Sequence, residues 1–244
     1  MARFAVIIPA AGKGERFGGR EKKTFAKLGG KPLFIQTIQL FINRDDVCQT
    51  ILAIAPEDMD AMKTRYAANL GFMGVKLVEG GKRRCDTVAN AIEIVTDEAD
   101  YIAVHDAARP CAADSMIDSV FAEAQKSGAA IPAIPITSTL KRVSKANVIE
   151  ETVARDGFFL AQTPQVFRRD WIADAYKKLG EIDEDFTDDA QLVAEAGYAI
   201  SIVRGDATNI KITTKSDIAL AQAILKSRPA KAVSKLSAFE EAQW

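Results

Sequence analysis

A glycine-rich loop with basic side chains follows the first apolar run of the chain. The run ends at Pro9, and the next residues read AAGKGERFGGREKKTFAKLGGKPL. Gly12 and Gly14 allow the backbone to approach a ligand closely and to point successive N–H groups at anionic oxygens. Four cations follow within a few residues, at Arg16, Arg20, Lys22 and Lys23. This combination favours a triphosphate site, although a solvated turn with surface lysines has the same composition.

A second candidate segment is VHDAARP, at residues 104–110. Asp106 comes directly after a buried apolar run, where a metal–triphosphate complex would lie, and Mg²⁺ takes one or two carboxylates plus phosphate oxygens. Arg109 could hold a phosphate with two parallel hydrogen bonds. The alternative role for Asp106 is that of a helix N-cap. His105, the only histidine, is expected to be packed or hydrogen-bonded at the strand end rather than to act as a base.

A third candidate lies near the C-terminal end, in DATNIKIT at residues 206–213. Lys211 stands between Ile210 and Ile212, so it projects to the face opposite its apolar neighbours. Such alternation is common in strands. At a sheet edge near Asp106, however, the same lysine would contact a phosphate.

The elements around these segments determine whether they meet. Strands are expected at residues 4–9, 50–55, 75–78, 101–105, 129–134 and 199–203. Helices are expected at residues 32–43, 57–70, 86–95, 116–126, 169–178, 188–195 and 216–226. This alternation predicts an α/β fold with a mostly parallel sheet covered on both faces. Ligands bind beyond the carboxyl ends of such strands, and residues 12–23, 80–84 and 106–109 all follow expected strands.

Residues 135–163 interrupt the alternation. The segment TLKRVSKANVIEETVARDGFF has period-two stretches and turn residues but no helical spacing, which predicts a β-hairpin or arm projecting from the sheet. No linker is strong enough to divide the chain. We therefore expect one domain over residues 1–226, followed by a polar, alanine-rich tail at residues 227–244.

Composition narrows the classes of function. The 244 residues carry 32 basic and 33 acidic side chains, and this balance argues against general nucleic-acid binding. Three cysteines, Cys48, Cys85 and Cys111, form no CxxC pair or metal-ligand spacing, which favours a reducing cytoplasm. The N-terminal apolar run is far shorter than the roughly 20 residues of a membrane span and lacks the stretch of a signal peptide. A cytoplasmic chain with no membrane contact is expected.

Taken in order, several motifs resemble those of the 2-C-methyl-D-erythritol 4-phosphate cytidylyltransferase family. They are PAAGKGERF, the lysine at Lys23, EGGKRR followed after one residue by DTV, VHDAARP, TLKR, TPQVF and NIKIT. The similarity runs from about residue 4 to residue 225. It implies a Rossmann-like nucleotidyltransferase fold and transfer of CMP from CTP to methylerythritol phosphate in isoprenoid biosynthesis, with release of pyrophosphate. It also implies Mg²⁺ dependence and a homodimer in which the β-arm reaches the neighbouring subunit.

The resemblance also assigns roles to single residues. Arg16 and Lys23 match the family's basic pair on the triphosphate, and Lys211 is the third catalytic cation, on the α-phosphate. The nucleotide contacts carried over are Ala10, Ala11, Gly12, Gly14, Gly81 and Thr87. The contacts to the polyol phosphate are Asp106, Arg109, Thr139, Arg155 and Thr163, with Asp106 also the metal ligand.

Two features depart from the family and its relatives. The family often has Pro before the catalytic lysine and Gln after it, whereas this chain has Lys22 and Thr24. Many members of the wider superfamily carry a second acid just before the Asn of NIK, and Thr208 occupies that position here. Whether a second protein carboxylate binds the metal is therefore left open.

The expected chemistry needs no general base. A phosphate monoester has a second pKa near 6 and is mostly a dianion at neutral pH, so the protein has to position and neutralise two polyanions. The alternative function is that of a D-ribitol-5-phosphate cytidylyltransferase, a family that tends towards a Ser-Val-Arg-Pro run where this chain has AARP.

Functions of other classes fit less well. A nicotinamide dehydrogenase would have a third glycine in the loop and an acid where Pro56 follows the second expected strand. A nucleotide-sensing module without catalysis would be expected to lack at least one of Lys23, Asp106 and Lys211, and all three are present.

Overall fold

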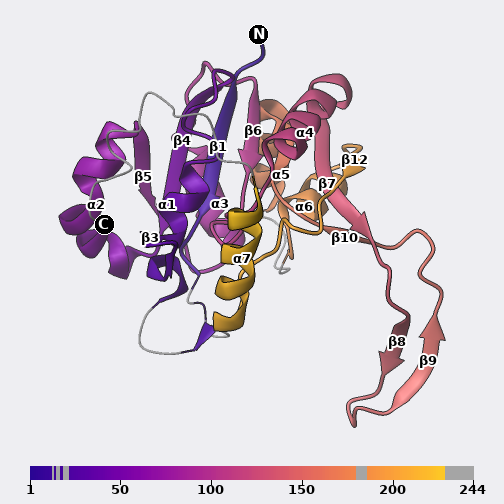
Figure 1. Ribbon diagram of the computed structural model, residues 1–244. Coiled ribbons are helices and arrows are strands. Elements are labelled where there is room, and N and C mark those ends of the chain that lie inside the picture. Colours follow the sequence, from indigo (N-terminus) through magenta and orange to yellow (C-terminus); the bar gives the residue numbers. More distant parts are fainter. Residues whose placement is uncertain (13, 15–16, 19–21, 180–185, 229–244) are drawn as a thin grey trace.

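The computed structural model describes residues 1–12, 14, 17–18, 22–179 and 186–228. Its main sheet has eight strands (Figure 1). They are β1 (Phe4–Pro9), β4 (Val47–Ile54), β5 (Val75–Glu79), β6 (Tyr101–Val104), β7 (Ala129–Pro135), β10 (Phe159–Ala161), β11 (Gln165–Arg168) and β12 (Ser201–Arg204). Their order across the sheet is β10–β7–β11–β6–β1–β4–β5, and β12 also pairs with β7.

The sheet is mostly parallel, as predicted. Strand β1 pairs in parallel with β4 and β6, β4 with β5, and β12 with β7. Strand β11 runs antiparallel between β6 and β7, and β10 runs antiparallel to β7. Neither of these short strands was expected, and β10 belongs to the main sheet although its residues fell within the expected arm at 135–163.

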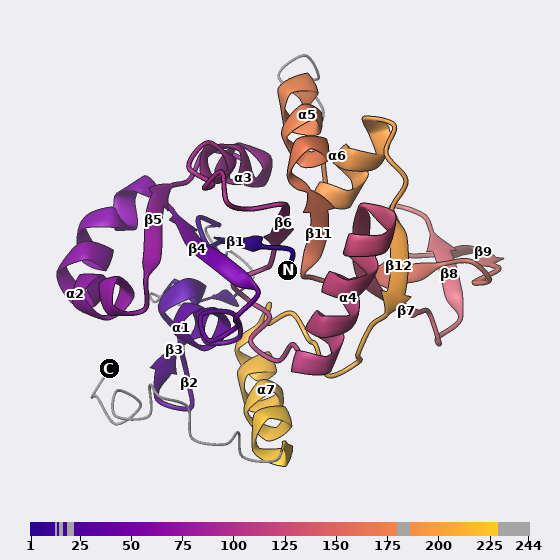
Figure 2. The ribbon, with the colours of Figure 1, turned by 90° about the horizontal axis from the view of Figure 1, so that it is seen from above.

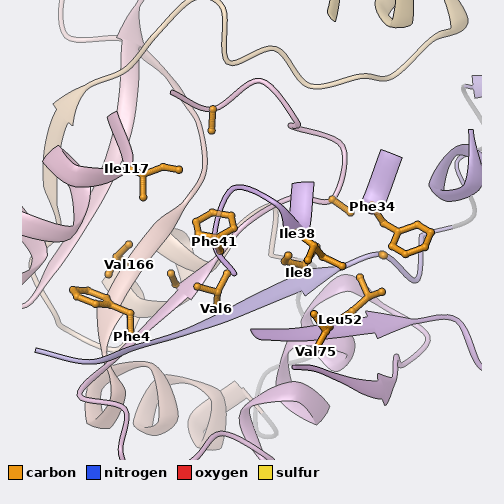
Figure 3. Packing of buried hydrophobic residues seen from close by; sticks show 14 of the residues in the cluster. Phe4, Val6, Ile8, Phe34, Ile38, Phe41, Leu52, Val75, Ile117 and Val166 are labelled. Carbon is orange, nitrogen blue, oxygen red and sulfur yellow. The ribbon is translucent and has the colours of Figure 1, made fainter. Parts of the chain in front are cut away.

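Helices cover both faces of the sheet (Figure 2). One face carries α1 (Leu33–Ile38), α2 (Met59–Phe72) and α4 (Asp114–Ser127), and the other carries α3 (Arg84–Ile92), α5 (Arg169–Leu179) and α6 (Asp189–Glu195). In β1, Phe4, Val6 and Ile8 pack toward the first group (Figure 3), whereas Ile7 packs toward the second. Because both faces of β1 are buried, its sequence is a continuous apolar run.

Helix α1 is shorter than expected. It ends at Ile38, and residues 39–43 form turns instead of continuing to Asn43. The amides of Leu40 and Phe41 donate to carbonyls three residues back, so the last turn tightens although the apolar spacing continues. The final helix, α7 (Lys215–Ser227), packs with the loop that contains Ile212 in a separate apolar cluster.

The predicted β-arm is present. Strands β8 (Leu140–Val143) and β9 (Ile149–Val153) form an antiparallel pair apart from the main sheet, and Figure 1 shows this pair projecting far from the other elements. Within the described residues, the short remaining elements are β2 (Lys27–Leu28), β3 (Lys31–Pro32) and two single-turn helices, η2 (Lys23–Phe25) and η3 (Pro56–Asp58). None of the helices described has the length and apolar character needed to cross a bilayer. Of the expected tail, residues 229–244 lie outside the described residues.

Candidate active site at the carboxyl edge of the sheet

A cavity of about 200 Å³ lies beyond the carboxyl ends of β1, β5 and β6. It shares its glycine loop and lysines with a wider groove of about 1090 Å³. The predicted site residues that line the cavity are Ala10, Ala11, Gly12, Gly14, Lys23, Gly81, Thr87, Asp106 and Lys211. Four segments distant in sequence therefore meet where a parallel sheet is expected to bind its ligand. Arg16 lies outside the described residues.

Gly14 and Lys23 of the first loop lie close together at the cavity. Gly14 has a φ of 65°, a conformation that costs little for glycine and more for other residues. Its carbonyl accepts the amide of Phe17 at 2.8 Å. A Cβ on Gly14 would lie 3.1 Å from the Cβ of Lys23, so the lysine packs directly against the loop.

Lys22, the neighbour of Lys23, points elsewhere. Its Nζ bonds to Asp58 at 2.8 Å and to Glu57 at 3.2 Å, both in η3. Partial burial alone would lower the pKa of Lys22, but these hydrogen bonds and charges outweigh it and raise that pKa. Lys22 does not line the cavity, so the first loop contributes Lys23 rather than both lysines.

The loop after β5 packs closely against the first loop. A Cβ on Gly80 would lie 2.5 Å from the Cβ of Ala11, and a Cβ on Gly81 would lie 2.3 Å from the Cβ of Asp86. The buried hydroxyl of Thr87 donates to the carbonyl of Arg83 at 3.0 Å and accepts the amide of Gly81 at 3.1 Å. Thr87 therefore holds the shape of this loop.

Asp106 is the carboxylate of the cavity, and cations surround it. Its Oδ2 lies 2.9 Å from Lys211 Nζ and 3.4 Å from Arg109 Nε, and its Oδ1 lies 3.9 Å from Arg84 Nη2. Burial alone would raise the pKa of the Asp106 carboxyl, but the charges of Lys211, Arg84 and Arg109 hold it well below its usual range. The nearest following helix, α4, has Ala113 as its N-cap, so the N-cap alternative for Asp106 is wrong.

The donor set around Asp106 is compatible with Mg²⁺ that also binds phosphates. The described residues contain no cluster of three His, Cys, Asp or Glu side chains able to hold a metal by themselves. Thr208 is exposed, and its hydroxyl lies 3.3 Å from Arg228 Nη2. A single carboxylate matches a cation whose other ligands come from substrate and water.

Arg109 and Thr163 support the Asp106 segment from behind the cavity, and neither lines it. Arg109 donates to the carbonyl of Asn209 at 2.7 Å and to that of Ala161 at 3.5 Å. The hydroxyl of Thr163 accepts the amide of Asp106 at 3.1 Å. Their predicted contacts with substrate stay predictions.

His105 is packed, as expected. Its Nε2 lies 3.0 Å from the carbonyl of Arg109 and its Nδ1 lies 3.1 Å from the hydroxyl of Thr163. Because a carbonyl only accepts, Nε2 carries the proton and Nδ1 accepts from Thr163. Full burial lowers the pKa of His105 to about 4, so the ring is neutral at pH 7 and both nitrogens are occupied.

Thr139 and Arg155 lie in the arm, and both are exposed. Arg155 donates to the carbonyl of Thr137. Neither residue lines the cavity of its own chain, and the arm runs away from the sheet (Figure 1). The structure therefore does not bring these two together with Lys23 and Lys211 within one subunit.

Arg84 is one of several cavity residues to which sequence reasoning gave no individual role. It pairs with Asp189 in α6 at 2.6 Å. The signal that could have found Arg84 is its place at the end of residues 80–84, directly after β5. Its partner comes from the far end of the chain, and no local spacing indicates it.

The fold and this cavity define a Rossmann-like α/β nucleotidyltransferase. The family model for 2-C-methyl-D-erythritol 4-phosphate cytidylyltransferase (IspD) matches residues 4–227. The chain belongs to this family.

Individual relatives agree with the family match. A protein of Rhodopirellula baltica named 2-C-methyl-D-erythritol 4-phosphate cytidylyltransferase is 41% identical, over 92% of this chain and 95% of its own. One of the same name from Dechloromonas aromatica is 37% identical, over 93% and 100%. The crystal structure of the Thermus thermophilus cytidylyltransferase has a TM-score of 0.77 and 31% identity, and covers 93% of this chain and 100% of that one.

Proposed function

We propose that this chain transfers CMP from CTP to 2-C-methyl-D-erythritol 4-phosphate and releases pyrophosphate, as a step of isoprenoid biosynthesis. The family match supports the reaction. The observation that carries it in the structure is the meeting of Lys23, Asp106 and Lys211 in one cavity next to the glycine loop. Those groups suit a triphosphate and a second anion better than an uncharged substrate.

The reaction is a single in-line displacement. An oxygen of the methylerythritol phosphate forms a bond to the α-phosphorus of CTP, the bond from that phosphorus to the bridging oxygen of the β-phosphate breaks, and pyrophosphate leaves. The attacking phosphate is already a dianion, so no group has to remove a proton. His105 is buried and neutral with both nitrogens bonded, in agreement with a mechanism that uses no base. Lys211 would contact the α-phosphate, with Lys23 and Arg16 on the triphosphate.

We further propose that Asp106 holds a divalent cation, in the simplest case Mg²⁺. When bound, the cation would neutralise and orient the triphosphate oxygens. The Asp106 Oδ1 accepts no hydrogen bond from the described residues, whereas Oδ2 is 2.9 Å from Lys211. Oδ1 is therefore the oxygen that this carboxylate offers to a cation.

A homodimer formed through the arm is also part of the proposal. The arm and β10 expose large apolar side chains that their own chain leaves uncovered, namely Val143, Val148, Ile149, Phe158, Phe159 and Leu160. Exposed apolar surface of this extent marks a contact with another protein. A second copy would cover it and bring Thr139 and Arg155 to the neighbouring cavity. The cytoplasm is the proposed location, supported by three free cysteines.

A nucleotide panel tests the proposal. We expect pyrophosphate release from CTP with methylerythritol phosphate, and much slower release from UTP, ATP and GTP. Because Gly81 and Thr87 shape a close-packed loop at the cavity, the base has little room to vary. The Lys23→Ala variant serves as the control for contaminating pyrophosphatase or transferase activity. A strong preference for ATP would contradict the cytidylyltransferase assignment.

A further inference from the structure

Arg84 connects the cavity with a buried acid on another helix. It is the first residue of α3 and lines the cavity. Its Nη2 lies 2.6 Å from Asp189 Oδ2, and the Asp189 side chain is 0% exposed. The same nitrogen lies 3.9 Å from Asp106 Oδ1. One guanidinium therefore faces both the cavity carboxylate and a carboxylate with no access to solvent.

Asp189 is itself held in place. Its Oδ1 accepts the hydroxyl of Tyr176, from α5, at 2.6 Å. On either side of it, Gln165 of β11 donates to Asp188 Oδ2 at 2.8 Å and accepts the amide of Ala190 at 3.0 Å. The start of α6 is thus bonded to the sheet, and Asp189 has little freedom to move.

Different cations lie near the two carboxylate oxygens of Asp106. Lys211 and Arg109 lie on the side of Oδ2, and Arg84 lies on the side of Oδ1. Burial would lower the pKa of Arg84, but the charges of Asp189 and Asp106 outweigh it and raise that pKa. Arg84 therefore stays charged, and it faces Asp106 Oδ1 from the wall of the cavity.

A purely structural role explains the Arg84–Asp189 pair less well. Removing two charges from water is costly, and a packed apolar group of similar volume often stabilises a protein as well or better. The pair is instead placed at the cavity wall, on the side of the Asp106 oxygen that accepts no hydrogen bond from the described residues.

We propose that Arg84 is a positioning residue that fixes the Asp106 carboxylate, and that Asp189 and Tyr176 set the position of Arg84. The inference rests on the proposed function, because it concerns how Asp106 meets metal-bound CTP. Neither Asp189 nor Tyr176 lines the cavity, so substituting them changes no residue of the cavity wall and acts only through the position of Arg84.

The test uses Asp189→Asn and Tyr176→Phe in the full chain. For Asp189→Asn we expect kcat to fall roughly 10- to 100-fold, the usual range for residues that hold a metal ligand in position, and Tyr176→Phe should lose less. By calorimetry the Kd for CTP in Mg²⁺ should rise in both variants, while the Kd for CTP in EDTA stays unchanged. Arg84→Lys should keep more activity than Arg84→Met. Tyr198→Phe is the matched control, because it removes a hydroxyl bond to Asp174 (3.0 Å) outside this network.

The outcomes separate the two proposals. Lower melting temperatures with unchanged kcat and unchanged affinity for Mg²⁺-bound CTP would show that the pair is structural, and would overturn the inference. If Asp189→Asn does not fold, Tyr176→Phe and Arg84→Lys decide the question. A wild-type chain that releases no pyrophosphate would contradict the proposed function. The difference between the Kd for CTP in Mg²⁺ and the Kd in EDTA, compared between wild type and variants, would then still test the role of Arg84. A wild-type chain without any such binding would contradict both.

Discussion

The side chains of Asp106 and Lys211 form an ion pair, with 2.9 Å between Oδ2 and Nζ, although they belong to opposite halves of the chain. Two hydrogen bonds to backbone carbonyls hold the segments of these residues together. The amide of Ile212 donates to the carbonyl of Ala108 at 2.8 Å, and Arg109 donates to the carbonyl of Asn209 at 2.7 Å. Two loops at the carboxyl edge are thereby joined, and a carboxylate and a lysine meet inside the cavity.

Asp106→Asn should remove most turnover. The neutral amide is a weaker ligand to a hard cation than the carboxylate and supplies no charge, so pyrophosphate release should fall by roughly 10² or more in kcat. The variant should also lose about 1–3 kcal/mol of unfolding free energy, because three cations then surround a neutral group. Initial rates and thermal denaturation measure the two effects. A folded Asp106→Asn chain with wild-type kcat would exclude Asp106 as the metal ligand.

Lys211→Ala and Lys23→Ala should mainly affect the transition state. Without either lysine, the charge that develops on the phosphates in the transition state is less stabilised. We therefore expect kcat to fall by roughly 10² to 10³ for each variant. Initial rates over a range of CTP concentrations separate kcat from KM. A raised KM with unchanged kcat would mean that these lysines bind ground state and transition state equally.

Lys22→Ala is the matched control for Lys23→Ala. Lys22 is bonded to Asp58 and Glu57 and does not line the cavity. Since such partly exposed pairs contribute about 0–1 kcal/mol, the variant should keep its kcat and nearly all its stability. A loss of kcat as large as that of Lys23→Ala would place Lys22 on the triphosphate instead.

If the arm forms the proposed dimer, each active site should contain residues from both subunits. Mixed dimers of Arg155→Ala chains and Lys23→Ala chains should recover activity, because one of the two hybrid cavities then holds both wild-type residues. Each parent variant alone supplies the baseline, and heterodimers isolated with two affinity tags give the clearest measurement. Verified heterodimers that stay as inactive as their parents would show that both residues serve the same cavity or that the arm is structural.

The buried histidine predicts a pH dependence of stability. In the folded chain the pKa of His105 is about 4, whereas an unfolded histidine titrates near 6.5. Between these values the unfolded state binds more protons, so stability is full above about pH 6.5 and falls as the pH drops toward 4. The loss should amount to roughly 3 kcal/mol at most.

His105→Gln isolates this contribution. Carboxyl groups also titrate near the lower end of this pH range and change the stability of both proteins. The contribution of His105 is therefore the difference in unfolding free energy between wild type and variant at each pH. Denaturant unfolding at several pH values should give a flatter profile for His105→Gln between pH 6.5 and 4. Parallel profiles would mean that His105 is not buried and neutral in the folded chain.

Local sequence predicted the centre of the parallel sheet because β1, β4 and β6 are largely buried on both faces. The apolar runs of β1 and β4 are short and bounded by polar or turn residues, which favours strands over helices. Strands β10 and β11 have only three or four residues, and their pairing depends on β6 and β7, which no local pattern specifies. The segments at residues 12–23, 80–84 and 106–109 followed from their places after strands, since that rule holds for parallel sheets in general, whereas the roles of Gly81 and Thr87 came from the family resemblance.

Pairings across the chain could not be predicted in this way. The guanidinium of Arg109 contacts backbone carbonyls and Asp106, partners that its sequence position does not indicate, and its expected contact with phosphate stays a prediction. The Arg84–Asp189 pair depends on how α3 and α6 pack against the sheet. Both cases involve a side chain whose partner is set by tertiary contacts rather than by spacing in the sequence.

The choice between two polyol phosphates is the sharpest test of the assigned substrate. Ala107 and Ala108 line the cavity and offer apolar surface to the methyl branch that methylerythritol phosphate has and ribitol 5-phosphate lacks. With CTP, pyrophosphate release should give a kcat/KM for methylerythritol phosphate about tenfold or more above that for ribitol 5-phosphate, since a methyl group contributes about 1–3 kcal/mol in a fitted pocket. Equal or reversed values would contradict the substrate assignment and favour the ribitol-phosphate alternative.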